Sequence, residues 1–155
     1  MGVAGCGKSY VAARVAAALG LPMIEGDAFH SPESVAKMKA GEPLTDADRA
    51  GWLDRLSAEL AARPEGAVLA CSALKKAYRD RLRAAVSGLR FVYLQLSREA
   101  ALASVQGRAG HFFPVRLVDS QFEALEPPTG ESGVLTLDAT APLAMLEAEL
   151  RRMRA

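Results

Sequence analysis

Apolar runs of strand length alternate along the chain with segments in which apolar residues recur every three or four positions. The strand-length runs cover residues 22–25, 67–71, 90–96 and 133–138. A helical pattern follows each run, and a further helical pattern begins near the start of the chain. Strands that alternate with helices are typical of an α/β fold. We therefore predict a single three-layer domain over residues 1–155, with a mainly parallel sheet and helices on both faces.

Local signals mark where several helices begin and end. Apolar residues recur every four positions over residues 8–19, which predicts a helix with one buried face. Ser31, Thr45 and Ser97 each precede a helical pattern, and their side chains can accept hydrogen bonds from the first free N–H groups of a helix. A further helix is predicted over residues 115–125, because two prolines follow it.

The chain begins MGVAGCGKSY, which contains the spacing G-x-x-x-x-G-K-S at the start of the first predicted helix. Glycines in such a loop let successive N–H groups curl around phosphates, and the helix that begins there adds its positive end. Lys8 is placed to reach the β- and γ-phosphates of a nucleotide, and Ser9 to offer its hydroxyl to Mg²⁺. An accidental glycine-rich turn is the alternative. The predicted nucleotide contacts are Gly2, Gly5, Cys6, Gly7, Lys8 and Ser9.

Two carboxylates lie where the strand predicted over residues 22–25 ends, in the sequence Glu25-Gly26-Asp27. In open α/β sheets the ligand binds at the carboxyl ends of the strands, so these side chains are expected beside the phosphates. We assign Asp27 to orienting a substrate hydroxyl and accepting its proton, and Glu25 to holding Mg²⁺ through water. The alternative for both residues is a solvated turn in which Asp27 caps a helix.

Composition narrows the class of protein further. Half of the 155 residues are hydrophobic, 24% are charged and the net charge is +1, so bulk electrostatics predict neither a nucleic-acid nor a membrane partner. The two cysteines, Cys6 and Cys71, are far apart and form no metal or redox motif, which indicates reduced thiols. No apolar run approaches the length of a membrane span, and we expect a cytoplasmic protein.

Four stretches together resemble bacterial gluconate kinase: GVAGCGKS, EGDAFH with MKAGEPLTDADRAGWL, CSALKKAYRDRLR and GRAGHFFPVRLVDSQFEALEPP. The resemblance implies a P-loop kinase fold of the nucleoside-monophosphate-kinase type, with a lid at about residues 107–115 that closes over ATP. It also implies phosphorylation of D-gluconate by ATP to give ADP and 6-phosphogluconate, with Mg²⁺ as cofactor. A homodimer is implied by the family alone.

Gluconate is a small polyol with a carboxylate, so its site needs cations for the carboxylate and polar groups for the hydroxyls. With the resemblance, the substrate candidates are Asp27, His30, Arg49, Ser72, Lys76, Arg79 and His111, with Lys75 and Gln121 as weaker ones. Arg108, in the lid, is expected to touch the phosphates and neutralise charge in the transition state. Two alternatives stay open: the basic residues form a solvated helix face, or Arg49 pairs with Asp46.

The chain departs from the family pattern at its start. The resemblance implies an apolar strand immediately before the phosphate loop, central in the sheet between residues 67–71 and 90–96, whereas here only Met1 precedes it. Loss of a central strand would leave buried backbone groups without partners, at roughly 1–3 kcal/mol each. The first strand is thus apparently missing, and we expect that Met1 is an internal methionine of a longer native chain.

Two other functions are considered. The first is a related P-loop kinase of another small hydroxy acid such as shikimate, against which the stretches CSALKK and GHFF argue. The second is a truncated, catalytically inactive nucleotide-binding module. The presence of Lys8, Ser9 and Asp27 argues against that module, and the missing strand argues for it.

Overall fold

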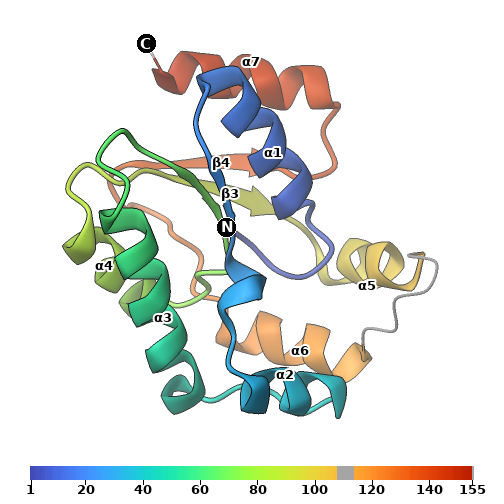
Figure 1. The fold of residues 1–155 in the computed structure, drawn as a ribbon. Helices are drawn as coiled ribbons and strands as arrows, with labels where there is room; N and C mark the ends of the chain where they lie inside the picture. Colours follow the sequence, from blue (N-terminus) through green and yellow to red (C-terminus); the bar gives the residue numbers. More distant parts are fainter. Residues whose placement is uncertain (108–113, 155) are drawn as a thin grey trace.

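The computed structural model describes residues 1–107 and 114–154, in which strands and helices alternate (Figure 1). The elements in chain order are α1 (Lys8–Leu19), β1 (Met23–Glu25), the 3₁₀ helix η1 (Gly26–Phe29), α2 (Pro32–Lys39), α3 (Asp46–Ala61), β2 (Val68–Ala70), α4 (Lys76–Ala85), β3 (Phe91–Gln95), α5 (Arg98–Gln106), α6 (Val115–Ala124), β4 (Val134–Asp138) and α7 (Leu143–Arg154). Strand β1 pairs with β2 and strand β3 pairs with β4, both in parallel. The predicted α/β fold with parallel strands is confirmed.

The two strand pairs are separated, and the first residues of the chain lie between them. The Met1 ammonium donates a hydrogen bond of 2.6 Å to the Val92 carbonyl, and the Leu94 N–H donates one of 3.0 Å to the Met1 carbonyl. On the other side, the Gly2 N–H donates to the Ser72 carbonyl at 3.2 Å. Met1 and Gly2 therefore bridge the two halves at one end, in the position that the resemblance implies for a central strand.

Beyond Met1 the space between β2 and β3 is a cavity of about 870 Å³, which we call the strand slot. Its lining includes apolar side chains of α1, β2, β3 and α7, among them Val11, Leu69, Val92 and Leu150. The slot also explains the partial burial of β2, whose three residues are all apolar. Val68 and Leu69 are only half-buried because one edge of β2 borders the slot.

A short apolar extension before Met1 is expected to fill the strand slot and stabilise the fold. Five residues of alternating valine and isoleucine match the five residues of β3. Each buried side chain contributes about 1.5–3 kcal/mol, against an ordering cost of about 1–2 kcal/mol per residue. We expect a net gain of about 3 kcal/mol and a rise in Tm of roughly 10 °C, measured by thermal and urea unfolding.

The matched control for this prediction is an extension of the same length with proline at alternate positions. Proline lacks the N–H that a central strand donates to its neighbour, so this extension should not pair in the slot. Equal Tm values for the two extended chains would contradict the prediction.

Three helix starts are as predicted. The Ser31 and Ser97 hydroxyls accept hydrogen bonds of 3.1 Å from the Ser34 and Ala100 N–H groups. At α3 the Thr45 hydroxyl accepts from the Asp48 N–H at 3.1 Å, and the Asp48 carboxylate accepts from the Thr45 N–H at 2.8 Å. That second bond, together with Lys37, lowers the pKa of Asp48 to about 2. Because a cap is a local contact, the sequence alone was sufficient to locate it.

Helices cover both faces of the strand pairs (Figure 1). Helices α3 and α4 pack around Trp52, Leu56 and Leu82, whereas α1 and α7 pack on β3 and β4 around Leu94 and Leu137. Helices α5 and α6 form a third apolar cluster, which includes Val3 of the glycine-rich loop. Among the described residues, the fold contains no helix with the length and hydrophobicity of a membrane span.

Candidate active site

The glycine-rich loop leads directly into α1, as the spacing of residues 2–9 predicts. Gly7 is the N-cap of α1 and has φ of 87°, a left-handed conformation that strains any residue with a side chain. With no side chain on Gly7 to cap the helix, the first N–H groups of α1 face outward, where a phosphate can accept from them. The Lys8 ammonium donates to the Val3 carbonyl at 3.0 Å and lies 4.0 Å from the buried Cys6 sulfur.

Two side chains from the helices α5 and α6 hold this loop. The Ala4 N–H donates a hydrogen bond of 2.6 Å to the Gln121 side-chain oxygen, and the Ser104 hydroxyl donates one of 2.8 Å to the Gly5 carbonyl. Both contacts join residues about a hundred positions apart in the sequence, which is why pattern alone did not find them. Gln121, a weak substrate candidate in the sequence analysis, therefore lies against the phosphate loop and holds its backbone.

Ser9 and Glu25, the two predicted metal ligands, are brought together. The Ser9 hydroxyl, in the first turn of α1, donates a hydrogen bond of 2.6 Å to the Glu25 carboxylate at the end of β1. A hydroxyl and a carboxylate oxygen suit Mg²⁺, which keeps several waters and takes few protein ligands. Within residues 1–107 and 114–154 no group of three acidic, histidine or cysteine side chains could hold a metal. A magnesium ion at this pair would therefore take its other ligands from water and nucleotide phosphates.

Asp27 lies in η1, which begins where β1 ends. The Trp52 indole N–H donates to the Gly26 carbonyl at 2.8 Å, and the Arg55 guanidinium donates to the Phe29 carbonyl at 2.8 Å, so α3 fixes this turn. A Cβ at Gly26 would lie only 2.5 Å from the Ala70 carbonyl oxygen, so only glycine allows η1 to pack this closely on β2. The Asp27 side chain itself is 79% exposed and free to meet a ligand.

His30 lies next to Asp27 but is buried. Its ring stacks on Trp52, with the ring centroids 4.6 Å apart, and its Nε2 is 3.9 Å from the Asp27 carboxylate. Burial lowers the pKa of His30, so the ring is neutral near pH 7. Its Nδ1 atom is buried without a hydrogen-bond partner in the part of the chain that the structure describes. The substrate contact assigned to His30 stays a prediction.

The N-terminal ends of α3 and α4 meet in a polar cluster around Tyr78. Lys75 donates to the Asp46 carboxylate at 2.9 Å, and the Tyr78 hydroxyl donates to the same oxygen. These two hydrogen bonds, that of Tyr78 first, lower the pKa of Asp46. The Arg49 guanidinium lies 5.8 Å from the centre of the Tyr78 ring and donates to the Leu44 carbonyl at 2.7 Å. Asp46 thus pairs with Lys75 and not with Arg49, which decides one alternative that the sequence left open.

Sequence reasoning missed the polar roles of Asp46 and Tyr78. It considered Asp46 only as a possible partner of Arg49 and assigned no role to Tyr78. Their contact joins positions 32 residues apart. The sequence does show that charged residues lie both at the start of α3 and in the loop after β2. This pattern does not indicate that the two segments are in contact.

The loop after β2 and the first turn of α4 carry two further candidates, Ser72 and Lys76. Ser72 accepts a hydrogen bond from Gly2 through its carbonyl, which places this loop beside the phosphate loop. Lys76 is exposed, and its ammonium donates to Asp80 at 2.5 Å. Both residues therefore stay candidates.

The prediction that Arg79 contacts the substrate is wrong for this structure. Its side chain is fully buried, and every N–H group of its guanidinium donates to a protein oxygen. It has no donor left for a ligand. The predictions for Arg108 and for His111, and most of the lid predicted at about residues 107–115, fall on residues 108–113, which lie outside the described residues.

Comparison with known proteins decides the family. A family model described as an AAA domain matches residues 1–128. The thermosensitive gluconokinase of Escherichia coli (strain K12) is 42% identical over 156 residues, which cover 98% of this chain and 83% of that protein. This chain belongs to the gluconokinase family of P-loop kinases. The gluconokinase of Gluconobacter oxydans is also 42% identical, over 100% of this chain and 89% of that protein.

A solved structure has the same fold. The crystal structure of a gluconokinase from Sinorhizobium meliloti 1021 superposes with a TM-score of 0.91 at 45% sequence identity, covering 99% of this chain and 87% of that one. The gluconokinase fold therefore extends over nearly the whole of this chain.

Proposed function

We propose that the protein transfers the γ-phosphoryl group of ATP to D-gluconate, giving ADP and 6-phosphogluconate. The observation that carries this proposal is the position of the Asp27 carboxylate. It is exposed at the end of β1, next to a Ser9–Glu25 pair suited to Mg²⁺ and a phosphate loop at the start of α1. The relatives named gluconokinase support gluconate as the acceptor.

Each residue of this site has a distinct task in phosphoryl transfer. The N–H groups of residues 2–9 and the Lys8 ammonium bind the phosphates and stabilise the charge that develops on them. Ser9 and Glu25 would hold Mg²⁺, which neutralises phosphate charge when bound. Asp27 orients the acceptor hydroxyl and accepts its proton as the new P–O bond forms and the bond to ADP breaks. Arg108 is proposed to add positive charge to the same phosphates.

The acceptor is proposed to lie between η1 and the loop after β2. Its carboxylate would be bound by cations from the ends of α3 and α4, with Arg49, Lys75 and Lys76 as candidates. Its hydroxyls would be bound by Asp27 and by Ser72, with His30 and His111 as further candidates. Arg49 and Lys75 each lie 5.8 Å from the centre of the Tyr78 ring, so both cations border the same side chain.

A homodimer and a cytoplasmic location are also part of the proposal. The homodimer rests on the resemblance to gluconate kinase. The location rests on the soluble composition and on two buried free cysteines, Cys6 and Cys71. Light scattering on the purified chain would measure the oligomeric state.

The test is a coupled assay of ADP release with D-gluconate, shikimate and a panel of other sugar acids. We expect the highest kcat/KM with gluconate, and a product heavier than gluconate by one phosphoryl group in mass spectrometry. Turnover of shikimate without turnover of gluconate would favour a kinase of another hydroxy acid. ATP binding without turnover of any acceptor would favour an inactive nucleotide-binding module.

A further inference from the structure

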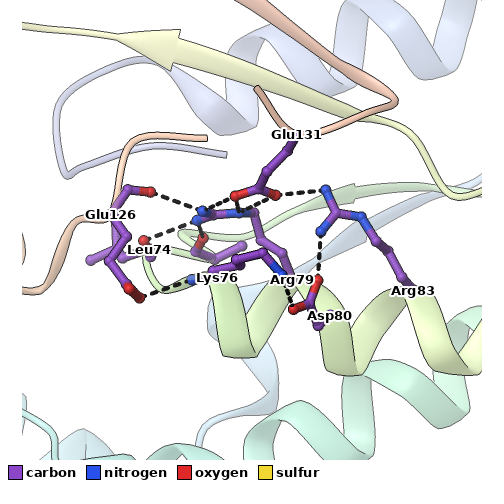
Figure 2. A network of polar contacts seen from close by, with 8 residues as sticks. Leu74, Lys76, Arg79, Asp80, Arg83, Glu126 and Glu131 are labelled. Carbon is purple, nitrogen blue, oxygen red and sulfur yellow. Dashed lines mark hydrogen bonds and ion pairs between the residues drawn. The ribbon is translucent and has the colours of Figure 1, made fainter. Parts of the chain in front are cut away.

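The buried side chain of Arg79, in α4, faces the carboxylate of Glu131 (Figure 2). Its Nη2 donates to one Glu131 oxygen at 2.5 Å and its Nε to the other at 3.1 Å. Arg83 donates to the same carboxylate at 2.7 Å. These bonds, those from Arg79 first, lower the pKa of Glu131, so it stays ionised at neutral pH. The buried positive charge of Arg79 is therefore compensated by a fixed negative charge.

The remaining donors of Arg79 join two segments that are distant in sequence. Nη1 donates to the carbonyls of Ala73 and Leu74 at 2.8 and 3.0 Å, in the loop after β2. Nη2 also donates to the Glu126 carbonyl at 2.9 Å, in the segment after α6. One guanidinium therefore fixes both segments, and its planar geometry sets their relative position.

The loop after β2 adopts a conformation that needs such support. Ala73 has φ of 44°, in the left-handed region that residues other than glycine rarely adopt. Glu126 supports the same loop with two more hydrogen bonds. Its N–H donates to the Leu74 carbonyl at 2.9 Å, and its side chain accepts from the Lys76 N–H at 3.0 Å, at the start of α4. Figure 2 shows Leu74, Lys76 and Glu126 close to the Arg79 guanidinium.

We propose that Arg79, held by Glu131, is a positioning residue that sets the loop of residues 72–76 for binding of the acceptor. The inference rests on the proposed function, because this loop carries Ser72 and Lys75 beside the proposed gluconate site. The Lys75 ammonium reaches Asp46 from this loop, and the Ser72 carbonyl accepts from Gly2. Arg79 acts on the acceptor only through the loop, since its own donors are all engaged.

A positioning role makes a kinetic prediction that a purely structural role does not. The phosphate loop is held by Gln121 and Ser104, which do not belong to the Arg79 network. If the hydrogen bonds from Arg79 to the loop are lost, the KM for gluconate should therefore rise and the KM for ATP should stay nearly unchanged. A purely structural role would reduce the fraction of folded enzyme, which lowers the apparent kcat and changes neither KM.

The experiment uses the full chain with Arg79→Lys, and with Glu131→Gln as a second variant that keeps the shape of the side chain but removes its charge. Lysine keeps the charge but cannot donate to all of these oxygens at once. We expect the KM for gluconate to rise about tenfold or more, with the KM for ATP within about twofold of wild type. Arg81→Lys is the matched control, because Arg81 lies in the same helix, is exposed and pairs with Asp54. In Arg81→Lys the KM for gluconate and the KM for ATP should both equal those of wild type.

Hydrogen exchange measured by mass spectrometry gives a readout that does not depend on turnover. In both variants we expect faster exchange at residues 72–76 and unchanged exchange at residues 4–9, which Gln121 and Ser104 hold. Gly2 is left out of the comparison because its N–H donates to the Ser72 carbonyl. If Arg79→Lys does not fold, Glu131→Gln decides the question with the same two readouts. Unchanged exchange at residues 72–76, or equal changes in both KM values, would overturn the inference. Absence of gluconate turnover by the wild-type chain would instead contradict the proposed function, and the exchange result would still test the role of Arg79.

Discussion

Replacing Asp27 with asparagine is expected to lower kcat with gluconate by about 10²–10⁴-fold, the usual contribution of a general base. Asparagine has nearly the same shape but cannot accept the hydroxyl proton. ATP binding should be kept, because Asp27 is not part of the phosphate loop. Since its side chain is 79% exposed, the substitution should also leave the Tm close to that of wild type. Steady-state kinetics with gluconate and ATP, with a thermal melt of each sample, measure these three quantities.

Asp54→Asn is the control for this experiment. Asp54 is also an exposed carboxylate, but it lies on α3 and pairs with Arg81 on the outer side of the fold. Its replacement should leave kcat within about twofold of wild type. A kcat for Asp27→Asn equal to that of Asp54→Asn would show that Asp27 does not accept the proton.

Replacing Lys8 with methionine is expected to impair both nucleotide binding and catalysis. Lys8 is the first residue of α1, where the phosphates are proposed to bind. A group that stabilises charge developing on a phosphate contributes about 10²–10³-fold in kcat. We expect a loss of that size in kcat and a rise of at least about tenfold in the KM for ATP. Methionine fills a similar volume, so the packing around Val3 and Cys6 should change little.

Lys39→Met is the matched control, because Lys39 is an exposed lysine at the end of α2. Titration with an ATP analogue, followed by fluorescence or calorimetry, separates the binding effect from the catalytic effect. Binding and kcat that both equal those of Lys39→Met would rule out the assigned role of Lys8. A fall in kcat alone would limit Lys8 to stabilising the transition state.

The helix starts and the phosphate loop were predictable because their determinants are local. The hydroxyl of Thr45 and the carboxylate of Asp48 are three residues apart, and this spacing alone closes both hydrogen bonds at the start of α3. Gly7 allows the left-handed turn that opens α1, and the two residues after it supply the ammonium and the hydroxyl. Contacts between near neighbours depend little on how the rest of the chain folds.

The substrate side was harder to predict because it depends on contacts between distant segments. Lysines and arginines in and just before α4 look alike in a sequence, since each lies in a charged helical pattern. The structure separates them: Lys76 is exposed, whereas Arg79 is buried by Glu131, which lies 52 residues further along the chain. Whether an arginine faces solvent or the interior is decided by what packs over it, and periodicity does not contain that information.

The sequence by itself determined that this chain has the parts of a P-loop kinase. It located the nucleotide loop, the carboxylates after β1 and the resemblance to gluconate kinase, because these depend on residue type at short spacing. Only the tertiary structure decided that Ser9 meets Glu25, that Gln121 holds the glycine-rich loop and that Arg79 supports the loop after β2. It also showed a slot between β2 and β3, since strand order and burial arise only when distant segments pack together.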